Sequence, residues 1–404
     1  MSSFAWLDYS EHDRRIALDV IDQFRERETR DELGLGAIRD GFAELFFPGT
    51  GTVQTRARYF FFIPWIYQHL EQRRTPSAEV KQRARRLECE LIEALLRSGA
   101  RDGDGVIGRQ RRNKLKRLPS SIYWQGLRAL GFLRIQASQE QYHRSLDRFY
   151  RKGGLELRAD DRELLDRSNA FNWNPSIPIA PKKFPAEATL ELTTEEAEFL
   201  RERITYARPA SLYRFLADLP EEPAEVEFPW EHPAVLRAPT QLQDQLAHAR
   251  NFSEVMHGAP LLYNLILSRL KKNGDWAESY ELKLADWRQM ISSRLPVLQR
   301  WDRDGFWRLV RETGAHVTGP TMRFADQWME IAMSSEIRRI AKSAAAERLI
   351  REREIQLKRA QARVNGGRAL DLWEGESGTR RLSYRWGIAT RMLRDMYDAR
   401  PGAD

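Results

Sequence analysis

Apolar residues recur at helical spacing through the part of the chain that follows Pro239. This periodicity predicts helices over residues 241–272, 279–295, 305–311, 321–359 and 384–397. Apolar side chains three or four positions apart form one buried stripe along a helix, whereas a half-buried strand requires strict alternation. The C-terminal half is therefore predicted to be helical, and the protein as a whole to be mainly α.

Helical signals also occur in the first half. Ser10 begins a predicted helix, Ile38 to Phe46 forms a second, and Glu79 to Arg97 is amphipathic over its whole length. The apolar run from Phe60 to Ile66 predicts a buried helix, although a strand of that length remains the alternative.

A smaller motif follows the amphipathic segment. A loop rich in glycine and aspartate, residues 99–108, leads to a short helix that opens at Leu118-Pro119-Ser120-Ser121 and ends near Gly131. A long helix, a loop, a short helix and then an extended stretch have the outline of a winged-helix or helix-turn-helix unit. We expect the free N–H groups near Ser120 to approach a phosphate, unless Trp124 is simply core and the serines only cap the helix.

Two proline-rich stretches suggest where the domains end. Prolines stand at 175, 178, 181 and 185, and a second proline-rich stretch runs from Pro209 to Pro239. Between them, Thr193 and Glu196 have the spacing of a capping box. We therefore predict an N-terminal domain over residues 1–168, a linker region with a short helix over 169–239, and a helical C-terminal domain over 240–404.

The composition and motifs disfavour several protein classes. No apolar run approaches the roughly 20 residues that cross a bilayer, and no hydrophobic signal core opens the chain, so we expect no membrane partner. The single cysteine, Cys89, excludes an internal disulfide and a cysteine-built zinc site, which indicates a cytoplasmic protein.

The seven histidines are not clustered and no phosphate-binding glycine loop with Lys-Ser/Thr is present, so neither a metal nor a nucleotide cofactor is expected. Glu281-Leu282-Lys283 has a nuclease-like spacing but lies in a segment predicted to be helical, which weakens that reading.

Basic residues are concentrated in two segments. Residues 101–158 contain 14 basic and 5 acidic side chains, a net charge of +9, and residues 336–400 contain 16 and 9, a net charge of +7. The whole chain carries only +8, so the remainder is acidic. Arginine supplies most of this charge, which suits phosphate recognition but also occurs in proteins from GC-rich genomes. The segregation of charge favours binding to DNA, and we expect the phosphate contacts to come from Arg58, Lys114, Lys116, Arg117, Arg380, Arg381 and Arg385.

A dense group of polar and aromatic residues lies near two glycine-containing turns in the first 70 residues. It comprises Glu32, Asp40, Gln54, Arg56, Arg58, Tyr59, Trp65 and Tyr67. Hydrolysis of an N-glycosidic bond requires a carboxylate, a polar group that orients it and aromatic walls for the extruded base. The structural alternative is that Glu32 caps a helix, Asp40 pairs with Arg39 or Arg56, and the aromatic residues are core.

Three stretches of the chain resemble a bacterial family that carries a domain of unknown function. They are residues 31–40 with 47–59 and Pro64-Trp65; Phe252-Ser253-Glu254 with His257-Gly258-Ala259 and Leu262-Tyr263-Asn264; and residues 378–386. The resemblance implies an antiphage-defence protein, in a family that includes a DNA glycosylase removing glucosylated hydroxymethylcytosine from phage DNA. Residues 53–60 are also similar to the catalytic segment of winged-helix alkyl-lesion DNA glycosylases. Gln54 matches the first glutamine of that segment, but Arg56 stands where an acid or amide is expected.

These resemblances imply a DNA glycosylase that acts on modified double-stranded phage DNA without a cofactor. Asp40 or Glu32 would be the catalytic carboxylate, oriented by Gln54, with Arg56, Tyr59 and Trp65 holding the base or its sugar adduct. The alternative is a DNA-binding defence subunit without enzymatic activity, which recruits a helicase or nuclease among other defence proteins. The two readings differ in whether the candidate residues converge in one pocket.

Overall fold

The computed structural model describes residues 31–101, 103–112, 115–156 and 172–402. The helix predicted from Ser10 lies outside the described residues. The chain divides into two compact units, each built from stretches far apart in sequence. Unit 1 comprises Met1–Phe42 with Asp244–Ser383, and unit 2 comprises Ala43–Gln243 with Tyr384–Asp404. The predicted domains are consecutive segments of the chain. Each unit instead combines distant segments, and two of the boundaries between units fall within helices. Local sequence signals do not report contacts between distant segments.

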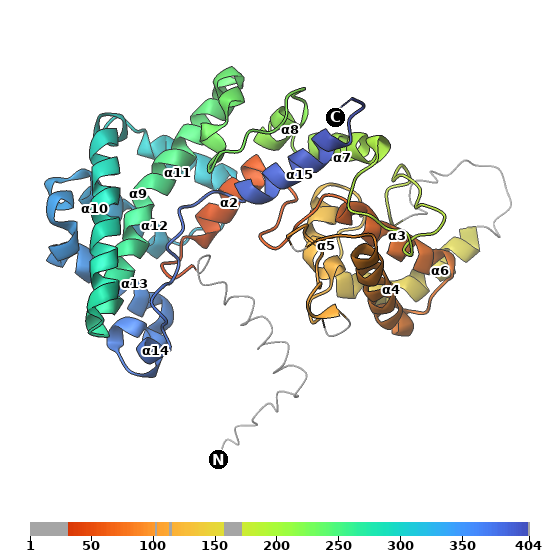
Figure 1. Cartoon of the computed structure of the whole chain (residues 1–404), viewed down its shortest axis with the longest axis horizontal. Helices are drawn as coiled ribbons and strands as arrows, with labels where there is room; N and C mark the ends of the chain where they lie inside the picture. The colour runs from red at the N-terminus through yellow and green to blue at the C-terminus, as the bar shows by residue number, and fades with distance from the viewer. Residues whose placement is uncertain (1–30, 102, 113–114, 157–171, 403–404) are drawn as a thin grey trace, which may run out of the picture. The chain divides into compact units, whose positions relative to one another are not determined.

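The described part of unit 1 is built from helices joined by loops. Its elements are α2 (Gly36–Phe46, which continues into unit 2), α9 (Thr240–Leu270), α10 (Gly274–Leu298), α11 (Arg303–Glu312), α12 (Gly319–Met333), η5 (Ser335–Lys342), α13 (Ala344–Lys358), η6 (Arg359–Gln361), η7 (Arg363–Asn365) and α14 (Arg368–Asp371). Helices α9 and α10 run antiparallel (Figure 1), and Arg269 near the end of α9 pairs with Glu281 near the start of α10 at 2.7 Å. The buried Trp328 and Trp287 rings pack 5.9 Å apart in the core of this unit.

The single helix predicted over residues 321–359 is wrong. The structure contains α12, η5 and α13 in its place. Ser334 accepts a hydrogen bond from the Glu336 N–H at 3.1 Å, and Ser343 accepts one from Ala346 at 3.3 Å. Each serine therefore caps the start of a new helix. The apolar periodicity does not break at these two positions, so periodicity alone predicted one helix, whereas the serines mark where it is divided.

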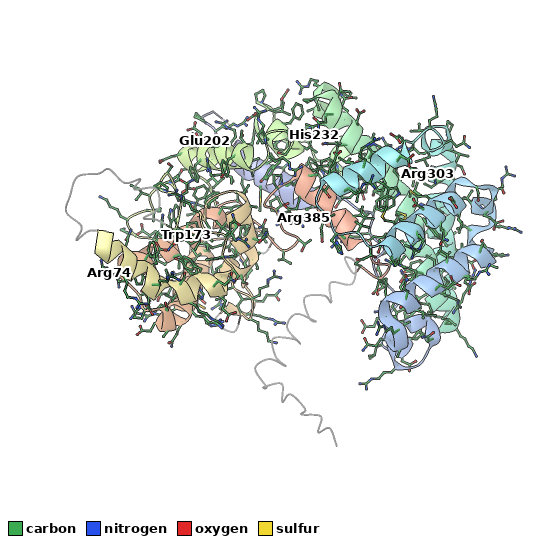
Figure 2. The ribbon with its side chains drawn as sticks, turned by 180° about the vertical axis from the view of Figure 1, so that it is seen from behind. Arg74, Trp173, Glu202, His232, Arg303 and Arg385 are labelled. Carbon is green, nitrogen blue, oxygen red and sulfur yellow. The ribbon has the colours of Figure 1, made fainter. Side chains whose placement is uncertain are left out.

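Unit 2 is also helical, and it is rich in aromatic residues. Its elements are α3 (Tyr59–Gln72), α4 (Ser77–Arg97), α5 (Pro119–Ala129), α6 (Gln139–Glu156), α7 (Thr194–Ala207), α8 (Leu212–Ala217), η3 (Pro229–Glu231), η4 (Pro233–Arg237) and α15 (Trp386–Asp398). The apolar run at residues 60–66 is a helix, α3, and not a strand. Trp173 lies among these helices (Figure 2) and contacts the rings of Tyr67, Trp124 and Tyr142.

The mainly helical class predicted from the sequence is confirmed. The described residues form no strand, although Leu133 and Trp173 form an isolated β-bridge after α5. The predicted capping box is also confirmed, because Thr193 accepts from the Glu196 N–H at 3.2 Å and Glu196 accepts from the Thr193 N–H at 3.0 Å. Among the described helices, none combines the length and the apolar character that crossing a membrane requires.

Candidate nucleic-acid interface

Glu32 is buried in unit 1 and surrounded by cations. Its carboxylate accepts hydrogen bonds from Lys358, from Ser377 and from Arg363, whose Nη1 lies 2.8 Å away. Burial would raise the pKa of Glu32, but Lys358 and Arg363 outweigh it and lower the pKa to about 2. Glu32 is therefore held as an anion by three donors and does not cap a helix.

A second buried carboxylate, Glu354, completes this arrangement. It accepts hydrogen bonds from the Tyr263 hydroxyl at 2.6 Å and from Lys358 at 2.9 Å. The Arg363 guanidinium also donates to the Tyr263 hydroxyl at 3.1 Å. We call this group the ion network; its members are Glu32, Tyr263, Glu354, Lys358, Arg363 and Ser377. Two carboxylates are matched by two cations, which is the condition under which buried charge is tolerated.

The other predicted residues of unit 1 are nearer the surface. The Asp40 side chain is 46% exposed and pairs with Arg39 at 3.1 Å, as the structural alternative expected. Arg381 lies 3.5 Å from the buried Glu254 carboxylate, and Arg380 is exposed. Within the described part of unit 1, Glu32 and Asp40 therefore have separate partners.

Gln54, in unit 2, is buried and stabilises a turn. Its Oε1 accepts from the Gly51 N–H at 2.9 Å, and its Nε2 donates to the Gly49 carbonyl at 3.2 Å. Both ends of the amide are used locally, so the structure gives Gln54 a positioning role in the glycine turn of residues 48–52.

Arg56 is fixed by a carboxylate that sequence analysis missed. Its Nε lies 2.7 Å from Asp395 of α15, whose second oxygen accepts from the Ala57 N–H at 2.7 Å. Burial raises the pKa of Asp395 to about 6, although Arg56 and the Ala57 N–H oppose that rise. No local signal could have paired Arg56 with Asp395, because 339 positions separate them.

The remaining predicted pocket residues are part of the core of unit 2. Arg58 pairs with Glu196 at 3.0 Å, the Tyr59 hydroxyl accepts from Ile107 at 3.0 Å, and Trp65 donates to the Pro178 carbonyl at 2.7 Å. All three side chains are buried. Arg58 is therefore placed in a buried ion pair and not at the surface.

The N-terminus of α5 already has a carboxyl group as its partner. Ser120 is fully buried, and both its N–H and its hydroxyl donate to the Glu88 carboxylate at 2.8 Å. Burial raises the pKa of Glu88 to about 7. Among the expected phosphate contacts, Lys116 is exposed, Arg117 is half-buried and Arg385 binds Glu44, whereas Lys114 lies outside the described residues.

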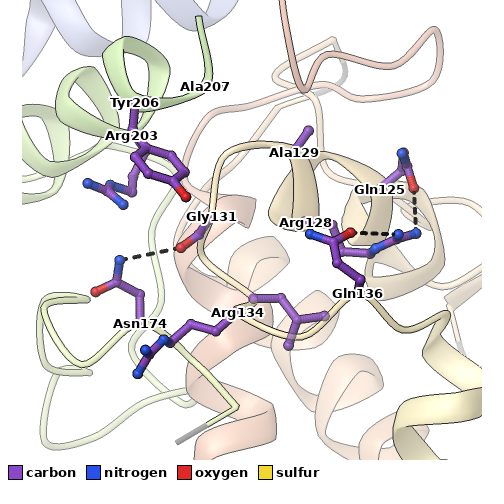
Figure 3. A pocket seen from close by; sticks show the side chains of 11 residues that line it. Gln125, Arg128, Ala129, Gly131, Arg134, Gln136, Asn174, Arg203, Tyr206 and Ala207 are labelled. Carbon is purple, nitrogen blue, oxygen red and sulfur yellow. Dashed lines mark hydrogen bonds between the residues drawn. The ribbon is translucent and has the colours of Figure 1, made fainter. Parts of the chain in front are cut away.

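A cavity in unit 2 brings together basic and amide side chains that are not among the predicted site residues. Its volume is about 770 Å³, within the range of ~300–1,000 Å³ typical of ligand sites. We call it the interface cavity; it is lined by Gln125, Arg128, Ala129, Gly131, Leu133, Arg134, Gln136, Asn174, Arg203, Tyr206 and Ala207 (Figure 3). Three arginines and three amide side chains face one space, and no carboxylate is among these described lining residues.

The end of α5 positions one side of the interface cavity. Arg128 donates to the amide oxygens of Gln125 at 3.0 Å and Gln136 at 2.9 Å, which holds its guanidinium between them (Figure 3). Asn174 donates to the Gly131 carbonyl at 3.3 Å. Gly131 has a φ of +69°, a left-handed conformation that suits glycine, and lets the chain turn after α5.

Helix α7 supplies the other side through Arg203 and Tyr206. These residues are three positions apart and so lie on one helix face. The Arg203 guanidinium lies 4.8 Å from the centre of the Tyr206 ring, and Tyr206 is 67% exposed. The +9 charge segment had already included Arg128 and Arg134, but sequence analysis gave Arg203 and Tyr206 no function. The one sequence signal for this pair was its i, i+3 spacing near the end of a capped helix, which places the two side chains on one helix face.

The described residues therefore form a helical protein with an arginine-lined cavity in unit 2. The described residues contain no group of three His, Cys, Asp or Glu side chains that could hold a metal ion. The chain belongs to the family of unknown function DUF6361, whose family model matches residues 1–400. No curated protein and no solved structure matches the chain.

Proposed function

We propose that this protein binds DNA through the interface cavity and hydrolyses the N-glycosidic bond of a modified base in phage DNA. The observation that carries the DNA-binding part of the proposal is the convergence of Arg128, Arg134 and Arg203 on one cavity. A guanidinium fork binds phosphate oxygens bidentately, and amide side chains donate to phosphates or read base edges. A polyanion is the ligand class that this lining fits best.

The proposed chemistry is that of a DNA glycosylase acting in antiviral defence. Water adds to C1′ of the nucleotide, the bond between C1′ and the base breaks, and the base departs with the proton, leaving an abasic site. The modified base implied by the family resemblance is glucosylated hydroxymethylcytosine. We also propose that the protein works in the cytoplasm and that helices α4 to α6 serve as its winged-helix-like unit.

The catalytic carboxylate remains a choice between Asp40 and Glu32. Asp40 is half-exposed and has room to accept a proton from water, whereas Glu32 is enclosed by three donors and its pKa is about 2. A general base must be reached by water, and the exposed Asp40 meets this requirement. A carboxylate that only stabilises the oxocarbenium-like sugar must stay ionised, and the low pKa of Glu32 meets that one.

Base release is the direct test. Purified protein is incubated with phage DNA carrying cytosine, hydroxymethylcytosine or its glucosylated form, and abasic sites are counted with an aldehyde-reactive probe. We expect abasic sites in the glucosylated DNA and none in the cytosine DNA. Asp40→Asn should abolish release without weakening DNA binding if Asp40 is catalytic, whereas Asp286→Asn, at an exposed aspartate on α10, is the matched control.

A DNA-binding subunit that recruits a helicase or nuclease is the second candidate. The lack of a carboxylate among the described lining residues of the interface cavity favours it. Tight DNA binding without abasic sites on any of the three DNAs would overturn the glycosylase proposal and leave this one.

A further inference from the structure

We infer that the interface cavity holds an unpaired nucleotide of a single strand, whose base stacks on Tyr206. The inference rests on the proposed DNA binding but not on base excision. It follows from the exposure of Tyr206, from its contact with Arg203, and from the hydrogen-bonding groups that remain available in the cavity lining.

Tyr206 is exposed in a way that core packing does not explain. The residue is 67% exposed although it lines a cavity, whereas Tyr59, Phe60, Phe61, Phe62, Trp65 and Tyr67 of α3 are all buried. A base has an apolar face and stacks on an aromatic ring whatever its identity. In a duplex those faces are covered by neighbouring base pairs, so an accessible tyrosine favours an unpaired base.

Arg203 and Gly131 fix where the Tyr206 ring lies. The Arg203 guanidinium is 4.8 Å from the centre of that ring and 5.5 Å from the centre of the Phe199 ring. A Cβ on Gly131 would come within 2.9 Å of the Tyr206 ring, so only glycine permits this close approach. A ring held in place by its neighbours loses little freedom when a base stacks on it.

The polar groups nearby have unused donors. The Arg203 guanidinium lines the cavity beside the Phe199 and Tyr206 rings; its Nε is buried, so a ligand would meet the charge of the guanidinium and not that N–H. Gln125 and Gln136 use their oxygens to bind Arg128, and their amide N–H groups donate to no described residue. The amide groups of Gln125 and Gln136 match phosphate oxygens or the acceptor edge of a base. They line the same cavity as Tyr206 but lie around Arg128, whereas Arg203 lies beside the Tyr206 ring (Figure 3).

Fluorescence anisotropy tests the inference with three unmodified DNAs of one sequence: a single strand, a perfect duplex and a duplex with one unpaired base. We expect the single strand, and to a lesser extent the duplex with the unpaired base, to bind more tightly than the perfect duplex. Tyr206→Ala should weaken single-strand binding by about 5- to 150-fold, the range for loss of one base–aromatic stack. Tyr206→Phe, which keeps the ring, should bind as the wild type does.

The outcomes separate this inference from the proposed function. Equal affinity for all three DNAs, or unchanged single-strand binding by Tyr206→Ala, overturns the inference even if abasic sites form in glucosylated DNA. Preference for the single strand that depends on Tyr206 supports the inference even if no abasic site forms, in which case base excision alone fails. Because Tyr206 is largely exposed, Tyr206→Ala should fold, and thermal unfolding of the variant verifies this.

Discussion

The ion network of unit 1 and the interface cavity of unit 2 use charged residues in opposite ways. In the ion network, Lys358 and Arg363 are matched by the buried carboxylates of Glu32 and Glu354. In the interface cavity, three arginines share the lining with amides and no described carboxylate. Cations that are enclosed with counter-charges stabilise the fold, whereas we propose that the arginines of the interface cavity bind a polyanion. The count of basic residues in each stretch of sequence does not distinguish these uses.

The largest expected effect is on the stability of unit 1. Glu32→Gln leaves Lys358 and Arg363 partly uncompensated, and removing one partner of a buried pair costs about 3–5 kcal/mol. We expect urea unfolding, followed by circular dichroism, to show a loss of this size. Protein that remains folded should keep its DNA affinity; a loss of affinity without a loss of stability would contradict the contrast between the two regions.

The pH dependence of stability should differ in sign between the units. The pKa of Glu32 falls from 4.5 to about 2 on folding, so the folded state binds fewer protons than the unfolded state between these values. Its contribution, about 3 kcal/mol, is fully present above pH ~5 and is lost as the pH falls toward 2. Hydrogen exchange of α13, corrected for intrinsic rates, should therefore show protection decreasing below pH 5, and Glu32→Gln should remove this dependence.

Unit 2 should respond in the opposite direction. Burial raises the pKa of Asp395 from 3.8 to about 6 and that of Glu88 from 4.5 to about 7. At these two groups the folded state binds more protons than the unfolded state, so their contribution to stability increases as the pH falls from about 7 toward 4, against the smaller opposite contribution of His143, whose pKa burial lowers to about 4. We expect α4 and α5 to gain protection over this interval, and Glu88→Gln should diminish the gain. Parallel pH profiles in both units would show that the two regions do not differ as described.

A smaller effect is expected at Gln54. Gln54→Ala leaves the Gly51 N–H and the Gly49 carbonyl without their partner, which costs about 1–3 kcal/mol when the groups are buried. Gln125→Ala, at an exposed residue of the interface cavity, is the matched control and should leave the free energy of unfolding unchanged. Equal losses in the two variants would remove the distinction between a residue that supports the fold and one that faces the ligand.

The smallest expected effect is at Asp40. Its pair with Arg39 is partly exposed, and exposed ion pairs contribute roughly 0–1 kcal/mol. Asp40→Asn should therefore unfold at nearly the wild-type urea concentration. A loss as large as that of Glu32→Gln would show that Asp40 is structural and would remove it as a catalytic candidate.

Local signals predicted the helices well and the site poorly. The segment 79–97 became α4 and the capping box at Thr193 formed as expected, since both depend on residues within a few positions of each other. The predicted site failed to assemble as one group because Glu32 binds residues more than 300 positions away, and Arg56 likewise binds Asp395. The charge segment that contains Arg128 and Arg134 includes one side of the interface cavity, but only the fold brings Arg203 and Tyr206 to it.

The salt dependence of DNA binding tests the central claim most directly. The triple variant Arg128→Gln, Arg134→Gln and Arg203→Gln is compared with Arg214→Gln, Arg237→Gln and Arg269→Gln, which removes the same charge from arginines paired with acids outside both basic segments. The interface variant should bind DNA more weakly, and its plot of log affinity against log salt should be shallower by roughly 0.7–0.9 for each lost phosphate contact. The control variant should keep a slope close to that of the wild type. If the two triple variants lose affinity and slope equally, or if neither changes, the interface cavity is not where this protein binds DNA.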